Sequence, residues 1–556
     1  MLTNEKLGWC CHRGQYHHQV PVLPRYPAEA WHYLYTHARD TSLFSRKLNN
    51  LFAFSSIRVS GGFVHGLGVP SNVAISGRVY HQMRDTAQGE HSMRWFLYDE
   101  ASRAQQVLSQ KIPEGHFNIV NHLIRTVNPY VGHLQHAASR TNPDECFALE
   151  LRDDVVGGEV AAILHTSLST PIAPRSVVIW NHGETSTRTV NILSSHYEPL
   201  QYPLLFPQGT PGWHPGVSNN CSQIRWYRMR ILRDERFHLF GRLGNEYLVD
   251  MYSRVEDQRL DYLRRGRKQQ LADMKEVIRE ARERINRLDV GEPLDTNEQP
   301  EDRDTNCTAA EESFLLPATF PGSRAWASEQ VSDSLAIVAD RGDPSLFITM
   351  TTNPNWPEIQ TRLLPGQQAA DIPDIVNRAF KARLSNAMSQ IRKHFGKVAY
   401  SIKVTEFQKR GLPHIHMVLR LGISPHHDCS TDFKTNHLCD HGTEPGIPFH
   451  KLSQVISAEI PLEEDDPELR QLVLTYNQHP RSHLTSQRSR CNKDGRCIWR
   501  FPHQIREHNE LDPHGKVRFR RRREEDCWTA PYIPFLLRTM QCHVYVDVTS
   551  TVNVLW

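Results

Sequence analysis

Two histidines separated by one residue form the sharpest chemical motif in the chain. His414 and His416 flank Ile415 within a run of residues that is typical of a strand. Because alternate residues of a strand point to the same face, both imidazoles would project together while Ile415 points into the core. Two parallel imidazoles can bind one divalent cation. The motif is short, and a purely structural histidine pair is the alternative interpretation.

A third ligand for such a cation would have to come from a neighbouring strand. Glu406 lies before His414, across a predicted turn, and Gln408 is the other candidate. Two imidazoles and one oxygen leave positions open for water and a phosphate oxygen. This set suits Mg²⁺ or Mn²⁺ acting as a Lewis acid on a phosphodiester. Lys409 and Arg410 lie in that turn beside the predicted metal, and they are candidates for contact with a nucleic-acid strand.

A second cluster combines two histidines with two cysteines, and it predicts a structural zinc site. Two imidazoles and two thiolates suit tetrahedral Zn²⁺, whereas a set of unrelated loop residues is the alternative. The cluster consists of His479, His483, Cys491 and Cys497. The chain has 11 cysteines in total, an odd and sparse number for its length. This number disfavours a disulfide framework and fits a soluble intracellular protein.

The densest basic run is Arg518-Phe519-Arg520-Arg521-Arg522-Arg523. Its guanidinium groups could hold phosphates while Phe519 stacks on a base, so all of its arginines are candidates for DNA contact. Because Glu524-Glu525-Asp526 follows immediately, a solvated loop is the alternative.

The elements that must position the histidine pair form an α+β pattern. Strand-like runs are predicted at 346–351, 398–407 and 414–421, and an amphipathic helix at 375–395. A connection containing Gly and Pro joins the last two strands as a hairpin. The expected fold is therefore an antiparallel sheet flanked by helices.

Thr349 and Thr351 of the first predicted strand would share one face of the sheet. The family resemblance described below implies that this face is directed toward the histidines and contacts DNA. Ordinary strand positions are the alternative interpretation.

The chain of 556 residues is long enough for several domains. A formal net charge of +3 excludes binding to nucleic acid by overall charge, although a local basic patch remains possible. No apolar run is long enough for a membrane span, and the first residues do not form a secretory signal. We expect a β-rich N-terminal region at 1–200, a helical segment at 201–265, a charged helix and linker at 266–313, a sheet core at 314–425, and a zinc and basic region ending in a core strand at 426–556.

The strings around the histidine pair resemble a known family. Residues 347–359 resemble the first motif of the replication-initiator-like region of Helitron transposases. Residues 406–416 look like the second motif, the His-hydrophobic-His signature of rolling-circle, or HUH, endonucleases. Further strings, at 202–207, 247–252 and 456–461, are also similar to this family.

The resemblance implies an HUH-type fold, in which a metal positions a DNA phosphate and a tyrosine attacks it to form a 5′-phosphotyrosyl intermediate. His414 and His416 would be metal ligands, with Glu406 or Gln408 as the third. Single-stranded DNA would be the partner, and the location would be nuclear. In the family a helicase follows the nuclease, so a helicase region or a full-length transposase encoded elsewhere is a further expected partner.

The nucleophile is the difficulty with this assignment. Family tyrosines lie on a helix after a strand that resembles residues 543–548, and here the chain stops at Trp556 without that helix. It also has no Walker A string, so no helicase chemistry is expected. Tyr532 and Tyr545 remain nearby, and Tyr545 is expected to be a packing residue. We therefore expect a Helitron-like fragment that binds DNA and metal but is inactive alone. A degenerate, non-catalytic DNA- or zinc-binding module is the alternative, and a general metal-dependent hydrolase finds little support.

Overall fold

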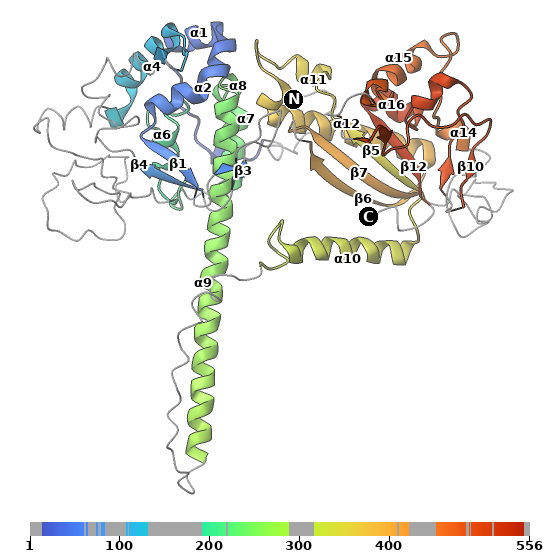
Figure 1. The fold of residues 1–556 in the computed structure, drawn as a ribbon. Coiled ribbons are helices and arrows are strands. Elements are labelled where there is room, and N and C mark those ends of the chain that lie inside the picture. Colours follow the sequence, from blue (N-terminus) through green and yellow to red (C-terminus); the bar gives the residue numbers. More distant parts are fainter. Residues whose placement is uncertain are drawn as a thin grey trace, which may run out of the picture. The chain divides into compact units, whose positions relative to one another are not determined.

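A computed structural model describes residues 14–59, 63–64, 74–75, 79–83, 107–108, 110–131, 192–217, 221–288, 316–408, 411–421, 452–484, 489, 491–513 and 516–549 (Figure 1). The chain divides into two compact units. The N-terminal unit comprises Lys6–Val290 and Arg362–Pro373. The sheet unit comprises Gly291–Thr361 and Asp374–Trp556, together with Met1–Glu5.

The described part of the N-terminal unit is mainly helical. Its helices are α1 (Ala28–Thr36), α2 (Ala38–Phe52), α4 (Glu114–Val127), α6 (Tyr197–Gln201), α7 (Gln223–Arg233), α8 (Arg236–Leu239) and α9 (Arg242–Leu288), with the 3-10 turn η1 (His17–Gln19). Two short antiparallel pairs accompany them: β1 (Ser55–Val59) with β4 (Val79–Met83), and β2 (Phe63–Val64) with β3 (Ala74–Ile75).

The helices α1, α2 and α4 differ from the β-rich region that we predicted for residues 1–200. The physical reason is visible in α2, whose buried face includes Thr41, Ser45 and Asn49 beside Leu48 and Phe52. These positions follow the helical period, but small polar residues occupy several of them. A pattern based on apolar residues alone therefore does not reveal the helix.

A buried polar centre fixes the beginning of α9 in the N-terminal unit. Glu198 and Arg254 form an ion pair of 3.4 Å, and both side chains are fully buried. The Glu198 carboxylate also accepts hydrogen bonds from the Trp213 backbone N–H at 2.6 Å and the Tyr247 hydroxyl at 2.7 Å. These bonds satisfy the buried charges. Helix α9 begins within the segment 201–265 that we predicted to be helical, and Tyr247 and Met251 share its buried face.

The sheet unit is built on four antiparallel strands in the order β12-β5-β7-β6 (Figure 1). These are β5 (Leu346–Thr351), β6 (Val398–Phe407), β7 (Pro413–Leu421) and β12 (Val544–Val548). Between β5 and β6 lies helix α12 (Pro373–Phe395). The three predicted strands, the predicted helix and the final core strand are therefore confirmed. The fold is mixed helix and sheet, as expected.

The remaining elements of the sheet unit surround this core. They are α10 (Arg324–Arg341), α11 (Pro357–Gln360), α14 (Leu452–Val455), α15 (Pro467–Tyr476), η5 (Arg481–Leu484), β8 (Asn492–Lys493), β9 (Arg496–Cys497), β10 (Glu510–Leu511), β11 (Val517–Arg518), η6 (Glu524–Trp528) and α16 (Pro534–Met540). The turn η3 (Ala369–Asp371) belongs to the N-terminal unit. No helix among the described residues is both long and apolar enough to cross a membrane.

The two faces of the sheet differ in burial. One face carries Ile348 and Met350 on β5, Ile415 on β7 and Val546 on β12, and each of these is at most 1% exposed. The other face carries the histidines. On this histidine face His414 and His416 are partly exposed, whereas Thr349 and Asp547 are at most 7% exposed. One apolar face and one polar, half-buried face give the alternation that the sequence showed.

The segment after β5 anchors the strand end beside the histidines. Trp356 is fully buried, and its indole Nε1 donates to the Met540 carbonyl at 2.6 Å. The Asn353 side-chain amide donates to the Gln541 carbonyl at 2.8 Å. Arg383 on α12 pairs with Glu358 at 2.9 Å. These bonds join three separate segments and hold the carboxyl end of β5 in place.

Candidate functional site

Both histidines lie on β7, which runs between β5 and β6, and they point to the half-buried histidine face of the sheet. In the strand register, Thr349 is paired with His416, and Thr351 is paired with His414. The Oγ1 atom of Thr351 lies 2.7 Å from Nδ1 of His414, and that of Thr349 lies 3.2 Å from Nδ1 of His416. The two imidazole centroids are 4.7 Å apart. Each ring is thus bonded through Nδ1 to a hydroxyl on the neighbouring strand.

The state of His414 suits a metal ligand. Burial, together with the neighbouring His416 and His543, lowers the pKa of His414 to about 4, while Glu406 opposes this shift. The ring is therefore neutral near pH 7 and keeps a lone pair. If Nδ1–H donates to the threonine hydroxyl, that lone pair is on Nε2.

Of the two candidates for the third ligand, the structure places Glu406 beside the histidines. Its Oε2 atom lies 3.7 Å from Nε2 of His416, and its side chain is 62% exposed, so it has room to adjust. Gln408 opens the turn, where its backbone N–H donates to the Leu412 carbonyl at 2.9 Å. Lys409 and Arg410 lie outside the described residues.

The two remaining tyrosines are both engaged in the fold. The Tyr545 hydroxyl donates to Asp547 at 3.2 Å, and burial raises its pKa well above the ordinary value. Tyr545 shares the histidine face, but β5 lies between it and His416, a separation of about 10 Å between backbones. Tyr532 is 1% exposed, and its hydroxyl donates to the Glu459 carbonyl at 2.9 Å. Neither phenol is poised as a nucleophile.

The predicted zinc ligands converge on one point. The ligand atoms of His479, His483, Cys491 and Cys497 all lie within 4.8 Å of one another. Among the described residues, the histidine pair on the sheet and Glu406 do not form such a set. Nε2 of His479 lies 3.6 Å from the sulfur of each cysteine. Bonds of about 2.3 Å to sulfur and about 2.0–2.1 Å to nitrogen in a tetrahedron give this same separation, about 3.6 Å.

The second histidine of this cluster carries an unused buried atom. Nδ1 of His483 bonds to the Pro480 carbonyl, so it carries the proton. Nε2 of His483 is buried and has no hydrogen-bond partner among the described residues. A buried polar atom without a partner is costly, and a metal bond would remove that cost. Burial, together with His483 and His543, lowers the pKa of His479 to about 4, which keeps this ring neutral as well.

A short hairpin presents both cysteines. Strands β8 and β9 pair with Asn492 opposite Cys497 and Lys493 opposite Arg496. Asp494 and Gly495 form the connection and both have positive φ, at 52° and 78°. Asp-Gly is the sequence that favours such a two-residue hairpin, a signal that our sequence analysis missed.

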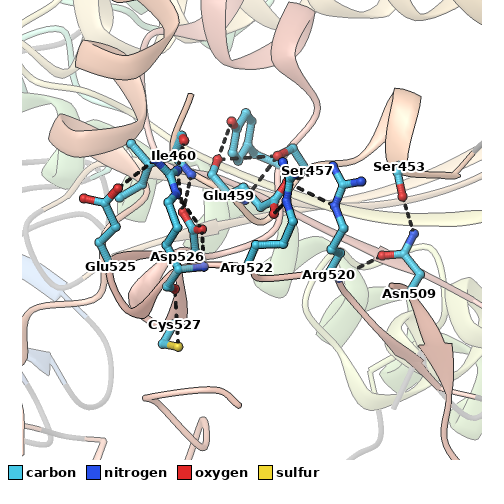
Figure 2. Close-up of polar contacts among 12 residues, drawn as sticks. Ser453, Ser457, Glu459, Ile460, Asn509, Arg520, Arg522, Glu525, Asp526 and Cys527 are labelled. Atoms are coloured by element: carbon cyan, nitrogen blue, oxygen red, sulfur yellow. Dashed lines mark hydrogen bonds and ion pairs between the residues drawn. The ribbon is translucent and has the colours of Figure 1, made fainter. Parts of the chain in front are cut away.

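The basic run is neutralised by the fold, as Figure 2 shows for its central part. The Glu459 carboxylate forms ion pairs with Arg520 and Arg522, each at 2.8 Å. Asp526 forms an ion pair with Arg523 at 2.9 Å. Outside that view, Asp512 forms an ion pair with Arg518 at 2.7 Å.

The other two residues of the run are buried. Arg521 and Phe519 are each 4% exposed. The guanidinium of Arg521 donates to the Phe519 carbonyl at 3.2 Å and the Thr529 carbonyl at 3.0 Å. In this conformation Phe519 is not available to stack on a base, and the run acts as internal structure. Its contact with DNA stays a prediction.

Comparison with known proteins identifies part of the chain. Residues 222–419 match the family described as the Helitron helicase-like domain at the N-terminus. The chain contains a Helitron helicase-like domain. The match runs from α7 through most of β7 and includes Glu406, His414 and His416. It ends before the four predicted zinc ligands and the basic run. No curated protein matches the chain. The chain is thus related to Helitron transposon proteins.

Proposed function

We propose that the histidine face of the sheet binds single-stranded DNA through a divalent cation held by His414 and His416, as an HUH-type scaffold for nicking and strand transfer. The observation that carries the proposal is the pair of partly exposed imidazoles on one face of the sheet, each bonded through Nδ1 to a threonine, inside a Helitron helicase-like domain. Glu406 is the third ligand in this proposal, since it lies beside His416. A nuclear location follows from the same family relationship.

The residues present fit Mg²⁺ or Mn²⁺. Two nitrogen ligands and one carboxylate leave coordination positions open, and a bound cation would polarise a phosphodiester as a Lewis acid. The chain's own contribution is positioning: Thr349 and Thr351 orient the imidazoles, and the anchored end of β5 keeps those hydroxyls in place. This role for the threonines differs from the DNA contact that we predicted from the sequence.

A second candidate function is binding without cutting. It is favoured by the tyrosines near the sheet, because the Tyr545 hydroxyl is bonded to Asp547 and Tyr532 is buried. Covalent catalysis needs a positioned nucleophile. The two functions share the metal and the strand, and they differ in whether a covalent adduct forms.

We also propose a structural zinc ion at His479, His483, Cys491 and Cys497. The separations between His479 and both sulfurs and the unsatisfied Nε2 atom of His483 support this. The ion would fix the hairpin of β8 and β9 against η5.

The test of the proposed function is strand binding by the full chain, with zinc retained and with or without added Mn²⁺. Fluorescence anisotropy of a labelled single-stranded oligonucleotide gives the affinity, and a denaturing gel reveals nicks or covalent adducts. Added Mn²⁺ should increase the affinity, and His414→Ala and His416→Ala should abolish that increase. His508→Ala is the matched control, since His508 is exposed and outside the site. An increase that survives in both site variants would refute the proposal.

A further inference from the structure

Basic side chains of the sheet unit differ in whether the fold already neutralises them. In the run at 518–523, four arginines have acidic partners, and the fifth, Arg521, is buried and donates to backbone carbonyls. In the hairpin and the turn that follows it, Lys493, Arg496 and Arg500 are exposed. Within the part of the chain that the structure describes, these three make no ion pair. Their charges therefore remain available to a partner.

The arrangement of two of these cations carries a cost. Lys493 and Arg496 are directly opposite each other in the strand register, so their side chains lie on the same side of the hairpin. Like charges in that position destabilise a strand pair. Asp494 in the connection is the one acidic residue of the hairpin, against three cations at 491–500. A negatively charged partner would relieve this repulsion, so the pair favours such a partner.

An exposed tryptophan lies beside these cations. Trp499 is 63% exposed and Ile498 is 44% exposed. They are the central residues of a tight turn that the Arg500 N–H closes by donating to the Cys497 carbonyl at 2.9 Å. Arg500 adopts a φ of 63° at the end of that turn. Both cysteines beside the turn are predicted zinc ligands, so the indole is carried by a short, well-fixed segment.

We propose that Trp499, Lys493 and Arg496 form a platform for single-stranded DNA, with the indole stacked on a base and the cations on adjacent phosphates. The inference rests on the proposed function and names where the strand is gripped outside the histidine site. Every base has a π-face, so the platform takes a strand without regard to sequence. The local positive charge complements the phosphates, which a neutral apolar partner would not use.

The test compares the affinities of variants of the full chain for a labelled single-stranded oligonucleotide without added Mn²⁺. Trp499→Ala should weaken binding about 5- to 150-fold, the range for loss of one stacked base. Trp499→Phe keeps an aromatic face and should restore most of the affinity. Tyr262→Ala is the matched control, since Tyr262 is a 79% exposed aromatic of the N-terminal unit.

A second pair of measurements separates recognition from structure. Arg496→Ala should reduce the slope of log affinity against log salt by about 0.7, as expected for one phosphate contact on a single strand. The same variant should melt at the same temperature as the unaltered chain or higher, because it removes a like-charge pair. A structural role would instead lower the melting temperature.

The outcomes are distinguishable. If Trp499→Ala and Arg496→Ala leave strand binding unchanged and the Mn²⁺ effect persists, the platform is refuted and the proposed function still stands. If the unaltered chain does not bind the strand at all, both the platform and the proposed function are refuted. If Trp499→Ala and Arg496→Ala weaken binding of a protein partner but not of DNA, the patch recognises protein and the platform is refuted.

Discussion

The bond between Thr351 and His414 offers a sharp prediction about metal affinity. Thr351→Val keeps the shape and the strand preference of the side chain but removes the hydroxyl that lies 2.7 Å from Nδ1. Without that acceptor the ring can rotate or change tautomer, and Nε2 is no longer directed reliably at the cation. Loss of such a partner typically weakens metal binding about 10- to 100-fold, or about 1.4–2.7 kcal/mol.

The assay is calorimetric titration of Mn²⁺ into the full chain, with the zinc site kept filled. Thr351→Ser retains a hydroxyl and is the matched control, which should bind within about threefold of the unaltered chain. Thr349→Val should have a smaller effect, because its hydroxyl lies 3.2 Å from His416. A Thr351→Val chain that folds normally and binds Mn²⁺ with unchanged affinity would refute the positioning role.

Three further predictions address the zinc cluster, the basic run and the tyrosine. Removing zinc with a chelator should lower Tm by about 5–10 °C, the effect of losing a ligand held at 100 times its Kd; a Cys491→Ser chain with full zinc content by elemental analysis would contradict the site. Burial raises the pKa of Glu459, but hydrogen bonds and ion pairs with Arg522 and Arg520 outweigh burial, and the pKa is lowered overall. The Glu459 carboxylate therefore stabilises the folded state above its ordinary pKa of about 4.3. This stabilisation is lost as the pH falls through the lower pKa of the folded state. Glu459→Gln should therefore cost about 1–2 kcal/mol near pH 7 and less near pH 3, and melting curves that stay parallel would argue against the ion pairs. Tyr545→Phe should leave strand binding unchanged, because the hydroxyl of Tyr545 is bonded to Asp547. A covalent DNA adduct that forms with the unaltered chain and disappears in this variant would identify Tyr545 as the nucleophile.

The sequence predicted the sheet well because its signals are local. The alternation around His414 and His416, the apolar run at 346–351 and the Gly- and Pro-containing turn each specify one element without reference to distant residues. The spacing of His479, His483, Cys491 and Cys497 also predicted one cluster of metal-binding side chains, and zinc binding by that cluster stays a prediction. The structure brings all four of those side chains together.

Long-range partners could not be predicted in the same way. Glu459 neutralises arginines that lie about 60 residues later, and nothing near the basic run shows that this carboxylate will meet it. The run therefore resembled a DNA-binding patch in the sequence. In the N-terminal unit, small polar residues on the buried face of α2 concealed a helix. Exposure has no local signal either, which is why Trp499 was not recognised as a surface residue.

The central claim is a divalent cation held by the histidine pair of the Helitron helicase-like domain. The most direct measurement is anomalous diffraction from crystals of the chain soaked with Mn²⁺. We expect an anomalous peak at coordination distance from Nε2 of both His414 and His416, with Glu406 turned toward it. Manganese bound only elsewhere, with both imidazoles free of metal, would contradict the account.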